Sequence, residues 1–191
     1  MTEYGLEEVQ DPSQAMLSQI HNQSVGTALT VIMEGTTPLL IEVQALTSPS
    51  YSPIPRRVAN GVDHNRLLML AAVSSKRAGL ALQNQDVIVN ITGGFKISEP
   101  AADIAIVMAI ASSLYNQPLG ADVAFVGEVG LSGELRQIHQ VDRRISEVAR
   151  LGLSKCILPE LLSEKEKTKL NSNLLYCRTV NQVIDKTDIN R

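Results

Sequence analysis

The stretch GGFKISEP, residues 93 to 100, brings a candidate nucleophile close to a candidate base. Lys96 and Ser98 are two residues apart, and in an extended segment such side chains point the same way. A serine attacks when a neutral lysine, kept away from water, accepts its proton. Directly before Glu99 and Pro100, however, Ser98 can instead cap a following helix, because proline suits the first helical turn. Both interpretations stay open, and we favour the cap.

Other catalytic and metal-binding patterns are missing from the sequence. It contains neither the P-loop pattern GxxxxGK[ST] nor a GxGxxG after a strand, so neither nucleotide-binding loop is expected. His21, His64 and His139 stand far apart, which is typical of surface or capping residues. Cys156 and Cys177 lie in apolar surroundings, which predicts buried, reduced thiols. We therefore expect no metal and no cofactor in this chain.

The charge balance limits how the chain could contact nucleic acid. Its formal net charge is −3, and only 3% of its residues are aromatic, with no Trp. Neither a global basic field nor a base-stacking platform is expected, so nucleic-acid binding would need a local patch that contacts phosphates. The apolar runs are shorter than the ~20 residues that span a bilayer. We expect a soluble, cytoplasmic protein without membrane contacts.

The first half of the sequence predicts a hairpin, a loop and a helix. Two apolar, β-branched runs follow Ser24 and are separated by a turn marked by Gly35 and Pro38. Residues 48–61 hold three prolines and predict an exposed irregular loop. A helix follows and ends at Gly79. Its expected inner face consists of Leu67, Leu70, Ala71, Ser74 and Ala78.

Strands and helices alternate in the second half. Residues 86–92 predict a strand, about 100–115 a helix, and 122–138 two strands around a turn at 130–133. The amphipathic helix at 141–152 is expected to bury four residues: Val141, Ile145, Val148 and Leu151. A strand, a charged helix near 160–170, another strand and a last helix complete the chain. This alternation predicts an α/β layered domain.

Three stretches of the sequence resemble one protein family in order and spacing. They are ALTVIMEG…LLIEVQAL from residue 28, GGFKISEPAADIAIVMAIASS from residue 93, and ADVAFVGEVGLSGELRQIHQVDRRISEVARLGLSKCILP from residue 121. Across roughly residues 24–160 the chain is similar to the proteolytic domain of the Lon family. It resembles more closely the Lon-like C-terminal domain of the bacterial RadA (Sms) family of DNA repair proteins. The resemblance implies a fold like the Lon proteolytic domain and ribosomal protein S5 domain 2.

The same resemblance implies that the catalytic dyad is lost. The Lon peptidase loop reads P-K-D-G-P-S-A-G, and the matching KISEPAAD places Ala101 at the nucleophilic serine. The Lon lysine lies in G-x-V-L-x-I-G-G-L-K, and the matching GELRQIHQVD places Asp142 there. Alanine cannot attack a carbonyl, and aspartate would repel the developing oxyanion. We therefore expect no peptidase activity from this pair.

RadA-type proteins are hexameric, DNA-stimulated ATPases that act in repair and recombination. The resemblance therefore implies that this chain is a ring-forming scaffold. It also implies contact with single- or double-stranded DNA during ATP-dependent branch migration. ATP, Mg²⁺ and Zn²⁺ would bind only in N-terminal domains, from which residues 1–23 would lead as a linker and short helix into a domain at 24–191. RecA recombinase is a further candidate partner. Thr37 stands where relatives often carry arginine. The expected DNA-backbone contacts are Arg56, Arg57, Arg66, Lys96 and Arg136.

Two other functions stay open. One is a peptidase that uses Ser98 and Lys96, and the other is a phosphate-binding site at the glycine pair 93–94. A closed ring would need two different contact surfaces on each chain. The sequence offers the Pro-rich loop at 48–61 and the charged side of the 141–152 helix, which is expected to expose Arg143, Arg144 and Glu147.

Overall fold

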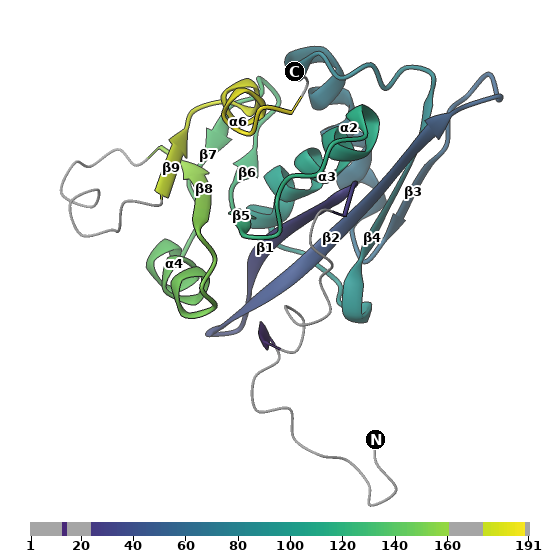
Figure 1. The fold of residues 1–191 in the computed structure, drawn as a ribbon. Coiled ribbons are helices and arrows are strands. Elements are labelled where there is room, and N and C mark those ends of the chain that lie inside the picture. The colour runs from purple at the N-terminus through teal and green to yellow at the C-terminus, as the bar shows by residue number, and fades with distance from the viewer. Residues whose placement is uncertain (1–12, 15–23, 161–173, 190–191) are drawn as a thin grey trace, which may run out of the picture.

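The structure, a computed structural model, describes residues 13–14, 24–160 and 174–189 (Figure 1). The helices expected at 12–21 and near 160–170 lie outside the described residues, apart from Ser13, Gln14 and Glu160. None of the helices in the described ranges is long and apolar enough to cross a lipid bilayer.

A seven-stranded sheet in the order β3-β4-β2-β1-β5-β8-β9 forms the centre, and β6 and β7 pair separately. The strands are β1 (Thr27–Glu34), β2 (Thr37–Pro49), β3 (Arg57–Asn60), β4 (Gln85–Ile91), β5 (Val123–Phe125), β6 (Glu128–Val129), β7 (Leu135–Arg136), β8 (Lys155–Pro159) and β9 (Leu174–Cys177). The helices are α2 (His64–Ala78), α3 (Asp103–Tyr115), α4 (Val141–Arg150) and α6 (Val180–Lys186), with short 3-10 turns η1 (Thr92–Gly94) and η2 (Pro100–Ala102).

The predicted hairpin of β1 and β2 is confirmed and lies in the middle of the sheet. The two strands are antiparallel, with Thr27 opposite Gln44 and Glu34 opposite Thr37. The turn is tighter than expected, because Pro38 lies within β2 opposite Met33. Strands β5, β8 and β9 add to the β1 side in parallel, and β4 and β3 add to the β2 side. The sheet is therefore mixed, as in an α/β layered fold.

Hydrophobic cores lie on both faces of this sheet. Side chains of β1 alternate between them, so that Ala28 and Ile32 face one core while Leu29 and Val31 face the other. The first core also contains residues of α2, α3 and α6, and the second contains residues of α4. Figure 1 shows α2 and α3 grouped together, and α4 apart from them. Both predicted helices are therefore confirmed, although Ala78 and Val141, which were expected to be buried, are only partly buried.

Two predictions about local structure were wrong. The stretch at 48–61 is not one irregular loop, because β2 runs to Pro49 and Arg57–Asn60 forms β3, parallel to β4. The three prolines lie at or before residue 55, so the residues after them can still donate backbone hydrogen bonds. The segment at 122–138 holds three strands, since β5 joins the main sheet before the β6–β7 hairpin begins.

The two cysteines are buried and unpaired, as the sequence predicted. Burial alone raises the pKa of the Cys156 thiol to about 12. The pKa of Cys177 is also raised, mainly by burial. Both thiols thus stay protonated near neutral pH and contribute to packing rather than to reactivity.

Candidate functional site

The position of the lost nucleophile is closed to solvent. Ala101 lies in η2, directly before α3, and only 1% of its surface is exposed. It packs in the core beneath α4, and its carbonyl oxygen accepts a hydrogen bond of 2.8 Å from the amide of Gly127. The backbone at Ala101 is therefore held by a hydrogen bond, and its side chain faces a packed interior.

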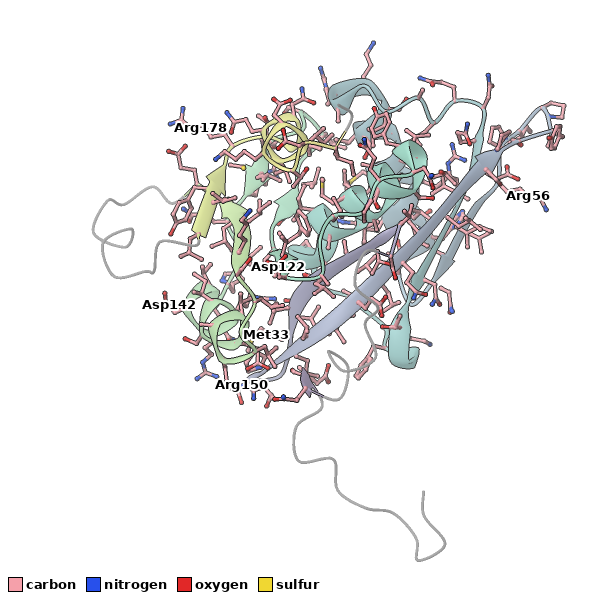
Figure 2. The ribbon with its side chains drawn as sticks, viewed as in Figure 1. Met33, Arg56, Asp122, Asp142, Arg150 and Arg178 are labelled. Atoms are coloured by element: carbon pink, nitrogen blue, oxygen red, sulfur yellow. The ribbon has the colours of Figure 1, made fainter. Side chains whose placement is uncertain are left out.

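The second dyad position lies on the surface. Asp142 is exposed in the first turn of α4, and Figure 2 shows it at the outer side of that helix. A lysine base must be desolvated to be neutral at physiological pH, and this position offers no such burial. The two positions expected to correspond to the Lon dyad, Ala101 and Asp142, thus differ in environment from each other, one buried and one exposed.

A buried ion pair lies beside Ala101 in sequence and ties three elements together. Arg144 of α4 donates two hydrogen bonds to Glu99, at 2.8 Å to Oε1 and 2.6 Å to Oε2. The same guanidinium donates to the carbonyl oxygens of Val31 and His139, and Glu99 also accepts from the amide of Met33 at 2.7 Å. Only 2% of the Arg144 side chain is exposed. The η2 loop, β1 and α4 are therefore joined by charge-assisted hydrogen bonds.

A second ion pair fixes the start of α3. Asp103 is buried, and its Oδ1 accepts a hydrogen bond from Arg66 Nε at 2.8 Å. Its Oδ2 accepts from the amide of Val129 at 3.0 Å and also contacts Arg66 Nη2. Burial raises the pKa of the Asp103 carboxyl, and the bonds from Arg66 and Val129 oppose this effect. Arg66 was expected to contact DNA, but its guanidinium is held by an internal partner in this structure.

Ser98 and Lys96 do not have the arrangement of a catalytic pair. Both are exposed on either side of the buried Ile97, and no hydrogen bond within the described part of the chain joins them. The predicted cap was also wrong. Glu99 and Ala102 occupy the cap positions of η2 and α3, and neither helix start has a side-chain cap. The carboxylate of Asp103, one residue further on, contacts Val129 and Arg66 instead.

Arg56 and Arg57 lie at the start of β3, away from the other predicted contacts. Arg56 pairs with Asp86 at 3.3 Å, but 78% of its side chain is exposed. Arg57 donates to the carbonyl oxygens of Arg56, Gln85 and Leu82. Its guanidinium is therefore bound to backbone at and before the start of β4. Burial lowers the pKa of Arg57, against a smaller opposing effect of Asp86. Of these two arginines, only Arg56 presents its charge mainly to solvent.

Lys96 and Arg136 lie nearer to the degenerate loop. Lys96 precedes Ile97, whose amide donates to the carbonyl of Gly61 at the end of β3. Arg136 in β7 is opposite Glu128, and its guanidinium donates to Glu134 at 2.9 and 2.6 Å. Of the five predicted residues, Arg66 contacts Asp103 at the start of α3. Arg56 lies on the side of the molecule away from Asp142 in Figure 2.

The expected charged side of α4 is partly buried, and this correction reveals residues that the sequence interpretation missed. Arg144 and Glu147 are buried, and Glu147 accepts hydrogen bonds from Arg150. The sequence could have indicated that Arg144 is buried, because it lies three residues after Val141 and four before Val148, within the apolar stripe of the helix. Arg143 alone follows the expectation, and it donates to the carbonyl of Thr36 at 2.7 Å.

The glycine pair does not form a phosphate site at a helix start. Gly93 and Gly94 both have a φ of +73°, and five residues separate them from η2. The buried carboxylate of Asp103 occupies the first turn of α3, which disfavours an anion there. Within the described ranges no cluster of three or more His, Cys, Asp or Glu could hold a metal ion.

Comparison with known proteins agrees with this geometry. Residues 70–187 match the Lon protease (S16) C-terminal proteolytic domain. The DNA repair protein RadA of Bacillus subtilis (strain 168) is 48% identical over 159 residues, which cover 83% of this chain and 35% of that protein. RadA of Haemophilus influenzae is 43% identical over 185 residues, 97% of this chain and 40% of that protein. RadA of Escherichia coli (strain K12) is 46% identical over 159 residues.

The chain spans 35% to 40% of the length of these relatives. The family match covers more than half of the chain, and the central sheet with helices on both faces is consistent with it. The chain therefore belongs to the Lon protease (S16) C-terminal proteolytic domain family and corresponds to the Lon-like part of RadA DNA repair proteins.

Proposed function

We propose that this chain is a non-catalytic Lon-like domain of a RadA-type DNA repair protein. It acts as a scaffold of an oligomeric ring, most simply a hexamer, and as a surface that contacts the DNA backbone during ATP-dependent branch migration. The ATPase activity, with its nucleotide, Mg²⁺ and Zn²⁺, would reside in other domains of the full-length protein, and RecA recombinase is a candidate partner.

The observation that carries this proposal is the state of the former peptidase site. Ala101 is buried, and the neighbouring Glu99 is held by a buried arginine that links the loop to α4. A domain that has replaced its nucleophile and stabilised the loop by internal ion pairs retains the shape of the fold without its chemistry. The relatives at 43% to 48% identity are named DNA repair proteins, which supports a role in DNA repair.

Solvent exposure distinguishes among the five candidate DNA contacts. Lys96 is exposed, and Arg56 and Arg136 are largely exposed despite their carboxylate partners, so these three can exchange internal contacts for phosphates. Arg57 and Arg66 already bind carbonyl oxygens or a buried carboxylate. Their removal is expected to reduce stability as well as any DNA binding, so they need separate treatment.

DNA binding is tested by fluorescence anisotropy at several salt concentrations, with the wild type and the variants Lys96→Ala, Arg56→Ala and Arg136→Ala. Each phosphate contact releases counterions, so each loss should reduce the slope of log affinity against log salt by about one unit. Lys155→Ala, which removes an exposed lysine at the start of β8, is the matched control and should leave the slope unchanged. An unchanged slope in the triple variant would exclude these residues as the DNA-binding surface.

A further inference from the structure

Exposed apolar side chains gather at one end of the sheet. Eight large hydrophobic residues are exposed in the described part of the chain, and five of them belong to β2, β3, β4 or the loop between β2 and β3. We call these five residues the β2–β3 patch: Leu46, Tyr51, Ile54, Val58 and Ile88. Tyr51 is 100% exposed and Ile54 80%.

The sheet register shows that the patch is continuous. Ile88 in β4 is opposite both Leu46 in β2 and Val58 in β3, so the three side chains form one row across adjacent strands. Tyr51 and Ile54 lie in the loop that joins β2 to β3, next to this row. The loop is held by the pairing of Arg56 with Asp86 and of the Ser50 amide with the Asn84 carbonyl.

No helix in the described ranges covers this part of the sheet. The opposite face of the same strands is buried, with Val43, Val87 and Val89 in the core beneath α2 and α3. The α4 core reaches Leu40 in β2 but includes no residue of β3 or β4. Figure 1 shows β2, β3 and β4 extending beyond the helices on the side away from α4. The row therefore lies on a sheet face that no helix of residues 24–160 or 174–189 covers.

The charges around the patch favour a protein partner over nucleic acid. Arg56 is paired with Asp86, and Arg57 is held by carbonyl oxygens. Beside the apolar row, Asn60 donates to Asn90, Asn90 donates to Gln44, and Gln44 donates to the carboxylate of Glu42. The largely exposed Arg56 at the edge can still contact phosphates, but the row itself carries no charge, and exposed tyrosine and branched aliphatic side chains are typical of protein contacts.

The size of the patch is suited to contact with another protein chain. If a fully exposed large apolar side chain presents ~150–200 Å², the five residues together present on the order of 500 Å². The adjacent amide side chains and Ser48 extend this surface toward the roughly 800 Å² that each partner buries in a stable interface. An area of about 500 Å² lies within the range of the largest apolar patch on a typical monomer, about 300–600 Å², and such patches are often functional.

We infer that the β2–β3 patch is one of the two surfaces through which a copy of this chain contacts its neighbouring copies. The inference rests on the proposed scaffold role, because that role requires contacts between identical chains. The charged side of α4 is a weaker candidate, since Arg144 and Glu147 are buried. The patch has the apolar content, the polar border and the exposure that such a contact needs.

The test measures the mass of the complete 191-residue chain by light scattering across a concentration series. Two independent double variants, Tyr51→Ser with Ile54→Ser and Leu46→Thr with Ile88→Thr, change only exposed positions and should leave the circular dichroism spectrum unchanged. Each should raise the concentration needed for assembly at least about tenfold. Leu131→Ser, at an exposed leucine in the β6–β7 turn, is the matched control and should assemble like the wild type.

The possible outcomes separate the patch from the scaffold role. If the wild type and both double variants assemble equally well, the patch is not the contact surface, and the scaffold role is unaffected. A wild type that stays monomeric at all concentrations would overturn both. Double variants that assemble normally but lose DNA binding in the anisotropy assay would assign the patch to nucleic acid instead. Loss of assembly with DNA binding at low salt retained would support the inference.

Discussion

Ala101 and Asp142 differ from a catalytic dyad in more than their side chains. The sequence was sufficient to predict that the nucleophile and base are missing, because the match to the Lon motifs depends only on residue type and spacing. It could not show that residue 101 is buried or that Glu99 pairs with Arg144, because that contact joins residues 45 positions apart. The burial of residue 101 and the exposure of residue 142 therefore add an environmental difference to the predicted change of residue types.

Restoring both residue types should not restore peptidase activity. In the variant Ala101→Ser with Asp142→Lys, the new hydroxyl would lie in a packed core and the new amine on the surface of α4. We expect hydrolysis of an unfolded protein substrate to stay at background in this variant, in the wild type and in Ser98→Ala, as measured by release of labelled peptides. Wild-type turnover that disappears in Ser98→Ala would instead identify a peptidase that uses Ser98 and Lys96.

The regular elements followed from the sequence where a local pattern determines them. The β1–β2 hairpin and α2, with its N-cap Asp63 and its C-cap Gly79, were predictable from β-branched runs, helical spacing and glycine. Strand β3 was not, because four residues after three prolines carry too little signal, and their pairing with β4 involves a partner about 30 residues away. Arg144 was missed because its charge concealed its place in the apolar stripe of α4.

At the scale of α4, the contact of Arg144 with Glu99 should be a main stabilising interaction. Breaking a buried ion pair typically costs about 3–5 kcal/mol, and Glu99 is partly exposed, so Arg144→Met should lower the free energy of unfolding by about 2–3 kcal/mol. Arg143→Met is the matched control, because the neighbouring arginine makes only an exposed bond to the Thr36 carbonyl, and it should cost less than about 1 kcal/mol. Urea unfolding followed by circular dichroism measures both, and equal effects would contradict this role for Arg144.

Over the whole molecule, carboxylates whose pKa values are shifted in opposite directions contribute to how the free energy of unfolding depends on pH. The pKa of Glu134 is lowered to about 2, first by a hydrogen bond from its own backbone amide and then by Arg136. The pKa of Asp86 is also lowered, chiefly by the Arg56 amide, whereas burial raises that of Asp103. Lowered pKa values stabilise the fold above the unfolded-state pKa and lose this effect as the pH falls. Asp103 acts in the opposite direction, because its protonated form is favoured by folding.

The variant Glu134→Gln should therefore reduce the free energy of unfolding at pH 7, and its difference from wild type should shrink as the pH falls from about 4.5 toward 2. Urea midpoints at pH 7, 4 and 2.5 measure this difference. Glu34→Gln, which removes an exposed carboxylate at the end of β1, is the control for the loss of one negative charge. A Glu134→Gln difference that does not change with pH would show that the carboxylate charge contributes nothing to stability.

The central place of β1 in the sheet also affects how the chain can fold during translation. β1 is complete at Glu34 and can pair with β2 almost at once, but its other neighbour, β5, begins only at Val123. At a synthesis rate of roughly 5–20 residues per second, one edge of β1 would stay unpaired for roughly 5–20 seconds. During that interval the hairpin exposes apolar residues on both faces, with Ala28 and Ile32 on one face and Leu29 and Val31 on the other. The nascent chain thus passes through a stage in which a chaperone could bind the free edge of β1, which later pairs with β5.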